Sequence, residues 1–87
     1  MYHVYIIESE ETGKWYIGST EDVQKRLTYH NAGKVRSTKP YIPYRLVYTE
    51  SFSSKTDARK REILIKKSGR IRKEIKERLN EAPSSIG

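Results

Sequence analysis

The chain has 87 residues, no cysteine and a formal net charge of +7, with 18 lysine and arginine residues against 11 aspartate and glutamate residues. It therefore has neither disulfides nor thiolate metal ligands, and its length fits a single domain. The positive charge favours polyanionic partners, nucleic acid first; a basic surface that serves only solubility is the alternative. No apolar run approaches the ~20 residues of a membrane helix, and the first residues do not resemble a secretory signal, so we expect a cytoplasmic protein without membrane contact.

The N-terminal part of the chain predicts a β-hairpin. Residues 2–8 and 14–19 are rich in aromatic and β-branched types, and the segment between them is polar and contains glycine. With residues 9–12 as the loop, Tyr5 would lie directly opposite Tyr16, on the same face of the sheet.

A helix should follow the hairpin, with Thr20 as its N-cap and an end near Asn31. Residues 32–44 contain glycine, proline and basic residues, and they predict an exposed loop. A third strand is expected over residues 44–52 because aromatic and β-branched residues return there.

Two more helices should complete the fold. Ser54 can cap the first of them, which should extend to about Lys67. Hydrophobic residues at every fourth position from Ile71 to Leu79 predict that the last helix is amphipathic.

The predicted fold class is α/β in the broad sense, specifically α+β, with a small three-stranded antiparallel sheet flanked by helices in the order β-β-α-β-α-α. The domain is expected to span residues 1–81. Residues 82–87, which are mostly small and polar and include a proline, are expected to form a disordered tail.

One carboxylate, that of Glu62, falls on the apolar face of a predicted helix, between Ala58 and Ile65. A buried carboxylate without a partner is costly, so Glu62 should form a structural ion pair with a nearby arginine, lie at the edge of the apolar stripe, or bind a ligand. Oxygen ligation would suit Mg²⁺ or a similar hard cation. No cluster of carboxylates indicates a two-metal site.

Four other residues carry groups that could act on a phosphodiester. Arg26 and His30 lie four residues apart and should share a helix face; arginine binds phosphate with paired hydrogen bonds, and histidine titrates near neutral pH. Tyr5 and Tyr16 supply phenols that can act as acids or bases. Each also has an ordinary interpretation, as a helix-surface residue or as a tyrosine packed in a sheet.

Together these residues resemble the GIY-YIG nuclease family, and the chain looks most like its short, single-domain bacterial subgroup of uncharacterised proteins. The resemblance covers about residues 2–80. Arginine stands ten residues after the second-motif tyrosine, as in the family, and histidine four residues further on. The matching positions are His3-Val4-Tyr5, Tyr16-Ile17-Gly18, Arg26, His30 and Glu62.

The resemblance implies a metal-dependent endonuclease that hydrolyses phosphodiester bonds in structured or single-stranded DNA, in repair or recombination. Tyr16 would act as the base or help to activate the attacking water, and His30 would relay or accept a proton. Arg26 would bind the scissile phosphate, and Tyr5 would hydrogen-bond the phosphate or the water. Glu62 would be the only protein ligand of a single Mg²⁺ or Mn²⁺. The identity of the general base stays open.

Basic residues interleaved with tyrosine predict where nucleic acid binds, DNA before RNA, on a protein expected to be a monomer. The same residues could instead form solvated faces. The alternative function is a non-catalytic basic DNA- or RNA-binding module on the same fold, because the asparagine that many catalytic members carry after the glutamate helix is missing at the expected place. The predicted nucleic-acid-binding residues are Lys34, Arg36, Lys39, Tyr41, Arg45, Lys66, Lys67 and Arg70.

Overall fold

The computed structural model describes the backbone of residues 1–84 and the side chains of residues 1–80. It confirms the predicted element order and fold class. The expected tail, 82–87, overlaps the end of the last helix, and its residues 85–87 lie outside the described residues. In chain order the elements are β1 (Tyr2–Ser9), β2 (Trp15–Thr20), α1 (Val23–Asn31), the short 3₁₀ helix η1 (Lys39–Tyr41), β3 (Tyr44–Phe52), α2 (Lys55–Lys67) and α3 (Gly69–Ser84).

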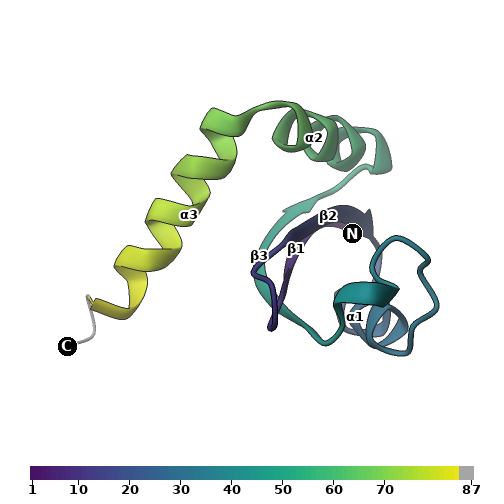
Figure 1. The fold of residues 1–87 in the computed structure, drawn as a ribbon. Helices are drawn as coiled ribbons and strands as arrows, with labels where there is room; N and C mark the ends of the chain where they lie inside the picture. Colours follow the sequence, from purple (N-terminus) through teal and green to yellow (C-terminus); the bar gives the residue numbers. More distant parts are fainter. Residues whose placement is uncertain (85–87) are drawn as a thin grey trace.

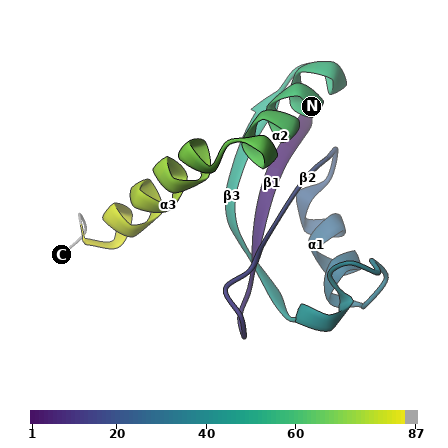
Figure 2. The same cartoon turned by 45° about the horizontal axis from the view of Figure 1, so that its top comes forward.

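The three strands form one antiparallel sheet in the order β2-β1-β3, so β1 is central and β2 is an edge strand. Helix α1 covers one face of the sheet and α2 the other, while α3 leads away from α2 (Figures 1 and 2). None of the described helices combines the length and the apolar composition needed to cross a membrane.

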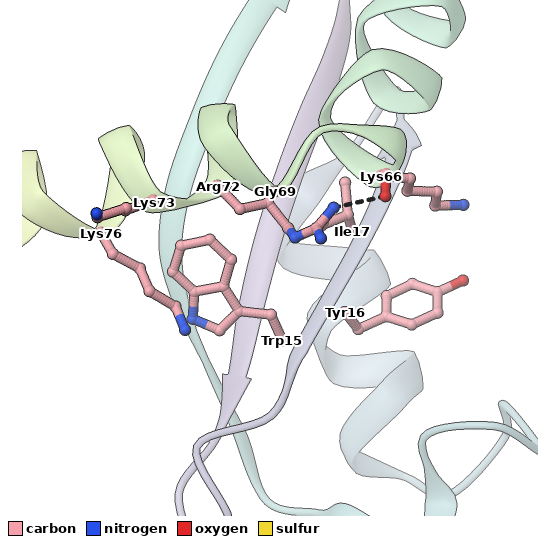
Figure 3. Close-up of a pocket in the computed structure, with 8 residues that line it drawn as sticks. All are labelled: Trp15, Tyr16, Ile17, Lys66, Gly69, Arg72, Lys73 and Lys76. Carbon is pink, nitrogen blue, oxygen red and sulfur yellow. Dashed lines mark hydrogen bonds between the residues drawn. The ribbon is translucent and has the colours of Figure 1, made fainter.

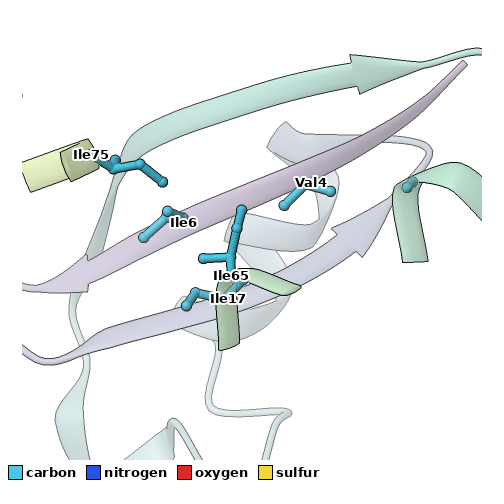
Figure 4. Close-up of a cluster of buried hydrophobic side chains, with 6 residues drawn as sticks. Val4, Ile6, Ile17, Ile65 and Ile75 are labelled. Atoms are coloured by element: carbon cyan, nitrogen blue, oxygen red, sulfur yellow. The ribbon is translucent and has the colours of Figure 1, made fainter. Parts of the chain in front are cut away.

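Alternation along the strands sends apolar side chains to both faces of the sheet. The face under α1 buries Tyr5 and Ile7 of β1 with Tyr44. The opposite face forms the larger core against α2 and α3 (Figure 4), and its buried residues are Val4, Ile6, Ile17, Ala58, Ile65 and Ile75. Because β1 is buried on both faces, Tyr5 and Ile7 lie on the α1 side of the sheet and Val4 and Ile6 on the α2 side.

The predicted hairpin register is wrong by two residues. Tyr5 pairs with Gly18, and Tyr16 pairs with Ile7. A shift of two positions leaves every side chain on its expected face, so Tyr5 and Tyr16 still point to the same side of the sheet.

The shift arises because the hairpin loop is longer than expected. It spans residues 10–14, and Gly13 belongs to the loop with a positive φ of 75°. The N–H of Gly13 donates to the carbonyl of Ser9, 2.9 Å away, and the N–H of Ser9 donates to the carbonyl of Lys14 at 2.8 Å. Glycine adopts this left-handed conformation without steric cost, which makes the longer turn available.

The helix caps confirm one prediction and correct another. Ser54 caps α2 as expected, accepting a hydrogen bond from the N–H of Asp57 at 3.0 Å. The cap of α1 is Asp22 rather than Thr20: the Asp22 carboxylate accepts from the N–H of Lys25 at 3.0 Å. The Thr20 hydroxyl accepts from the N–H of Asp22 and so supports the cap from two residues earlier.

Candidate active site

Tyr5 of β1 and His30 of α1 form a buried hydrogen-bonded pair. The Tyr5 hydroxyl lies 3.0 Å from His30 Nε2, and His30 Nδ1 lies 2.9 Å from Thr38 Oγ1. The Thr38 hydroxyl donates its one proton to the carbonyl of Val35, 3.3 Å away, so it must accept from Nδ1–H. His30 Nε2 therefore carries no proton and accepts the hydrogen bond of the Tyr5 hydroxyl.

Burial keeps both members of this pair neutral. It raises the pKa of Tyr5 to about 12, although hydrogen bonding and charge from Arg26 act in the opposite direction. It lowers the pKa of His30 to about 4, and the positive charge of Arg26 adds to this effect. Near neutral pH the pair therefore consists of a protonated phenol and an uncharged imidazole.

Gly18 of β2 makes room for the Tyr5 side chain. A Cβ atom at this position would lie 2.6 Å from the Tyr5 hydroxyl oxygen and 2.8 Å from the ring carbon that bears it. Such short distances do not occur for real Cβ atoms, so the glycine of the second motif is required by the close approach of a ring from the neighbouring strand.

Tyr16 and Arg26 border the Tyr5–His30 pair on its more open side. The Tyr16 ring centroid lies 4.7 Å from that of His30 and 6.3 Å from that of Tyr5. The Arg26 guanidinium carbon lies 5.1 Å from the ring centroid of Tyr29, and Arg26 forms no salt bridge within the described residues. Its positive charge thus remains available to an anion.

Glu62 points inward from α2, as predicted, and both of its oxygens are hydrogen-bonded. The Ser19 hydroxyl donates to Oε1 at 2.8 Å, and the Lys66 ammonium donates to Oε2 at 2.7 Å. Burial raises the pKa of Glu62, but the hydrogen bonds from Lys66 and Ser19 outweigh it and hold that pKa below its ordinary value. A structural ion pair is therefore present, as considered from the sequence, but its cation is Lys66 rather than the expected arginine.

The two parts of the site meet at the edge strand β2. Gly18 faces Tyr5 on the α1 side of the sheet, and the next residue, Ser19, binds Glu62 on the α2 side. Burial is the main cause of the raised pKa of Tyr5, and the negative charge of Glu62, on the other face of the sheet, adds a smaller contribution. All five residues expected from the motifs are thus brought to one edge of the sheet.

Comparison with known proteins assigns the family. The family model of the GIY-YIG catalytic domain matches residues 1–80. The chain belongs to the GIY-YIG family. A UPF0213 protein from Halobacterium salinarum is 47% identical over 75 residues, which cover 85% of this chain and 96% of the relative. The UPF0213 protein YazA from Bacillus subtilis is 38% identical over 74 residues, covering 84% and 75% of the two chains.

A solved structure shares the fold as well as the sequence. The solution NMR structure of a UPF0213 protein from Bacillus halodurans matches with a TM-score of 0.51 and 41% identity, covering 85% of this chain and 80% of the other. These relatives form a short, single-domain GIY-YIG family, as the sequence motifs predicted.

The donor atoms of this GIY-YIG domain fit one hydrated metal ion rather than a closed metal site. The described residues contain no group of three or more histidine, aspartate or glutamate side chains that could hold a metal. Glu62 offers carboxylate oxygens, the ligands that Mg²⁺ prefers, and Mg²⁺ commonly keeps several of its waters. The Lys66 ammonium is hydrogen-bonded to Oε2, the oxygen that such an ion would use as a ligand.

The eight predicted nucleic-acid-binding residues are not gathered at one place. Lys66 lies beside Glu62, whereas Arg45 forms a salt bridge with Glu8 at 3.1 Å and Arg70 pairs with Glu74 at 3.4 Å. The Tyr41 hydroxyl accepts a hydrogen bond from Lys14. The other four are Lys34, Arg36, Lys39 and Lys67, which form no salt bridge in the described part of the chain.

Sequence reasoning missed a groove beside the candidate active site. Only Lys66 of the eight residues lines it, together with residues of β2 and α3 (Figure 3). The basic face of α3 that borders the groove could have been predicted from the sequence, because basic residues recur three and four positions apart in the last helix. The residues missed are Trp15 and Lys76, whereas Arg72 and Lys73 belong to a basic run with Lys66, Lys67 and Arg70 that the sequence already offers as a phosphate-binding face.

Proposed function

We propose that this domain is a divalent-metal-dependent endonuclease that hydrolyses phosphodiester bonds in DNA, in structured or single-stranded regions that arise in repair or recombination. The observation that carries the proposal is the meeting of two dissimilar groups at the edge of β2. The neutral Tyr5–His30 pair lies beside the cation of Arg26, which forms no salt bridge among residues 1–80, and Glu62 lies across the strand. A structural core alone does not need this combination.

In this proposal Arg26 binds the scissile phosphate. Arginine can donate two parallel hydrogen bonds to phosphate oxygens and stabilise the charge that grows there in the transition state. Glu21 and Asp22 line the same pocket as Arg26, but Arg26 forms no salt bridge with any carboxylate of the described residues, which supports this role. Arg26 also lies close enough to Tyr5 and His30 to shift the pKa of each, so a phosphate bound by Arg26 would be beside both.

The two tyrosines take different roles. Tyr5 is buried, and its proton is committed to His30, so we assign it the role of a fixed phenol that hydrogen-bonds the phosphate or the attacking water through its oxygen lone pairs. Tyr16 is only half buried and its ring lies beside that of His30, so we assign it the activation of water. With its pKa near 4, His30 is a weak base near neutral pH; we assign it first the orientation of Tyr5.

Glu62 would hold the metal ion. Nucleases of this family generally use divalent metal ions, and a bound Mg²⁺ or Mn²⁺ supplies positive charge that stabilises the leaving oxygen. Ser19 would orient the carboxylate through its bond to Oε1, and Lys66 would release Oε2. The net charge of +7 supports DNA as the partner of a monomeric protein.

The direct test is a cleavage assay on labelled single-stranded, duplex, flap and four-way DNA, with Mg²⁺, with Mn²⁺ or with EDTA. Wild-type protein should give metal-dependent product, and Glu62→Gln should abolish it while remaining folded. Glu74→Gln is the matched control, because it removes an exposed carboxylate that pairs with Arg70. Salt-sensitive DNA binding without product at any metal concentration would favour the non-catalytic binding module instead.

A further inference from the structure

The groove beside the candidate active site lies along the edge strand β2, under the junction of α2 and α3. It is an open groove with a volume of about 670 Å³, within the range of ~300–1,000 Å³ typical of small-ligand sites. Basic and aromatic side chains dominate it, and no carboxylate of the described residues lines it. Its main residues are Trp15, Tyr16, Ile17, Lys66, Lys73 and Lys76 (Figure 3).

Two of the cations in the groove form no salt bridge within the described residues. Arg72 donates to the carbonyl oxygens of Ile65 and Lys66 and so caps the end of α2, and Lys66 is paired with Glu62. Lys73 and Lys76 form no salt bridge with any carboxylate among residues 1–80. These two lysines, three positions apart on α3, can therefore bind the phosphates of an incoming ligand.

Trp15 supplies a fixed aromatic plane in the same groove. Its indole N–H donates to Glu8 Oε1 at 2.9 Å, and its ring packs against the edge of the larger core. The Lys76 ammonium lies 5.0 Å from the ring centroid, so a mobile cation covers the ring face. An unpaired base could take the place of that cation, because the flexible Lys76 side chain can move to a phosphate.

The groove borders the candidate active site. Tyr16 and Lys66 belong to its lining, but the Tyr16 ring and the Lys66 ammonium point away from Trp15 (Figure 3), and they contact His30 and Glu62 respectively. A DNA strand with one phosphate at Arg26 and Glu62 would therefore place its neighbouring nucleotides along Trp15. A base inside a duplex is already stacked on both faces, so stacking on Trp15 favours a single-stranded flank.

We propose that this groove is a subsite for an unpaired nucleotide next to the cleaved phosphate, with its base stacked on Trp15 and its phosphates bound by Lys73 and Lys76. This inference rests on the proposed nuclease function and names the substrate class: DNA that is single-stranded on one side of the cut. Stacking on an aromatic side chain is sequence-tolerant, so the subsite selects strand structure rather than base sequence.

The subsite can be tested by binding in EDTA, where no cleavage occurs. A fluorescein-labelled dT12 strand is compared by anisotropy with a strand of equal length that consists of abasic residues. Wild-type protein should bind dT12 about tenfold more tightly. Trp15→Ala should remove that difference without weakening the binding of the abasic strand, and Trp15→Phe should retain most of it.

Lys73 and Lys76 should strengthen the binding of both strands through their charge, whether or not the strand carries bases. Lys73→Gln with Lys76→Gln should weaken both strands equally and reduce the slope of log affinity against log salt concentration by about 0.7 for each phosphate that is no longer neutralised. Lys55→Gln with Lys60→Gln is the matched control, because both lysines are exposed on α2 outside the groove. An equal effect of the control pair would contradict the assignment of Lys73 and Lys76.

A second measurement covers the case in which Trp15→Ala unfolds. Trp15 is the only tryptophan, so its intrinsic fluorescence in the wild-type protein reports on this position alone. Saturation with dT12 should quench it, and saturation with the abasic strand should not. Equal affinity of the two strands together with unchanged fluorescence overturns the subsite, even if the enzyme cuts DNA; base-dependent quenching without cleavage in Mg²⁺ supports it and contradicts only the nuclease.

Discussion

The Lys66 ammonium lies 2.7 Å from Glu62 Oε2, one turn further along α2. This ion pair satisfies the buried carboxylate, and it places a positive charge where the proposed divalent ion would bind. If Glu62 holds that ion through Oε2, as proposed, the ion would displace Lys66. Lys66 is half exposed and can swing towards the groove.

Removing Lys66 should strengthen metal binding. We expect Lys66→Met to raise the affinity for Mn²⁺ roughly two- to fivefold, which corresponds to the loss of a partly exposed ion pair of up to ~1 kcal/mol. Electron paramagnetic resonance of free Mn²⁺ measures this without DNA. Lys67→Met, one residue further on, removes the same charge away from Glu62, and equal effects of the two variants would contradict displacement.

The Tyr5–His30 hydrogen bond should contribute to stability. Tyr5→Phe leaves His30 Nε2 buried without a donor, which costs ~1–3 kcal/mol in the free energy of unfolding. Urea denaturation measures the difference. Tyr29→Phe removes a hydroxyl from an exposed tyrosine and should change stability little. If Tyr5→Phe is as stable as the wild type, the bond is not formed in solution.

Gly18 should not tolerate a methyl group while Tyr5 is present. Gly18→Ala should destabilise the domain by ~1–3 kcal/mol, since the new Cβ would overlap the Tyr5 hydroxyl. In a Tyr5→Leu background the cost should shrink, and the double-mutant cycle measures that coupling. Gly69→Ala is the control, because its nearest neighbour lies at an ordinary 3.6 Å. Additive effects of Gly18→Ala and Tyr5→Leu would rule out the proposed clash.

His30 should make the fold sensitive to acid. Its folded pKa of about 4 lies below its ordinary 6.5, so between these values the unfolded chain binds a proton that the folded chain does not. Stability is therefore expected to be fully present above pH 6.5 and to fall by up to about 3 kcal/mol as the pH decreases towards 4. His30→Gln should flatten this part of the stability profile. His3→Gln, which removes the other histidine, should leave the profile steep, and the reverse pattern would exclude His30 as the cause.

Most of the fold could be predicted from the periodicity of hydrophobic residues along the sequence. Alternation in the strands and the four-residue spacing of the helices predicted the correct order of elements, the inward position of Glu62 and the shared face of Arg26 and His30. The hairpin register failed because Gly13 fits either the end of a short loop or the middle of a longer one. Local sequence does not distinguish these two turns.

Interactions between distant segments could not be predicted in the same way. Thr38, which fixes the tautomer of His30, comes from a loop whose path depends on packing against α1. The bond from Ser19 to Glu62 joins residues 43 positions apart. The groove at Trp15 depends on how α3 leaves α2, and helix periodicity predicts the apolar face of α3 but not its direction.

The most direct test of the nuclease account is the single-turnover cleavage rate of a labelled flap DNA in saturating Mg²⁺ or Mn²⁺, compared between Arg26→Gln and Lys25→Gln. Both variants lose one positive charge from α1, and only Arg26 lies beside the Tyr5–His30 pair. We predict that Arg26→Gln cuts at least about a hundredfold more slowly, the usual loss when a transition-state donor is removed, and that Lys25→Gln retains near wild-type rates. Equal rates in the two folded variants would contradict the account.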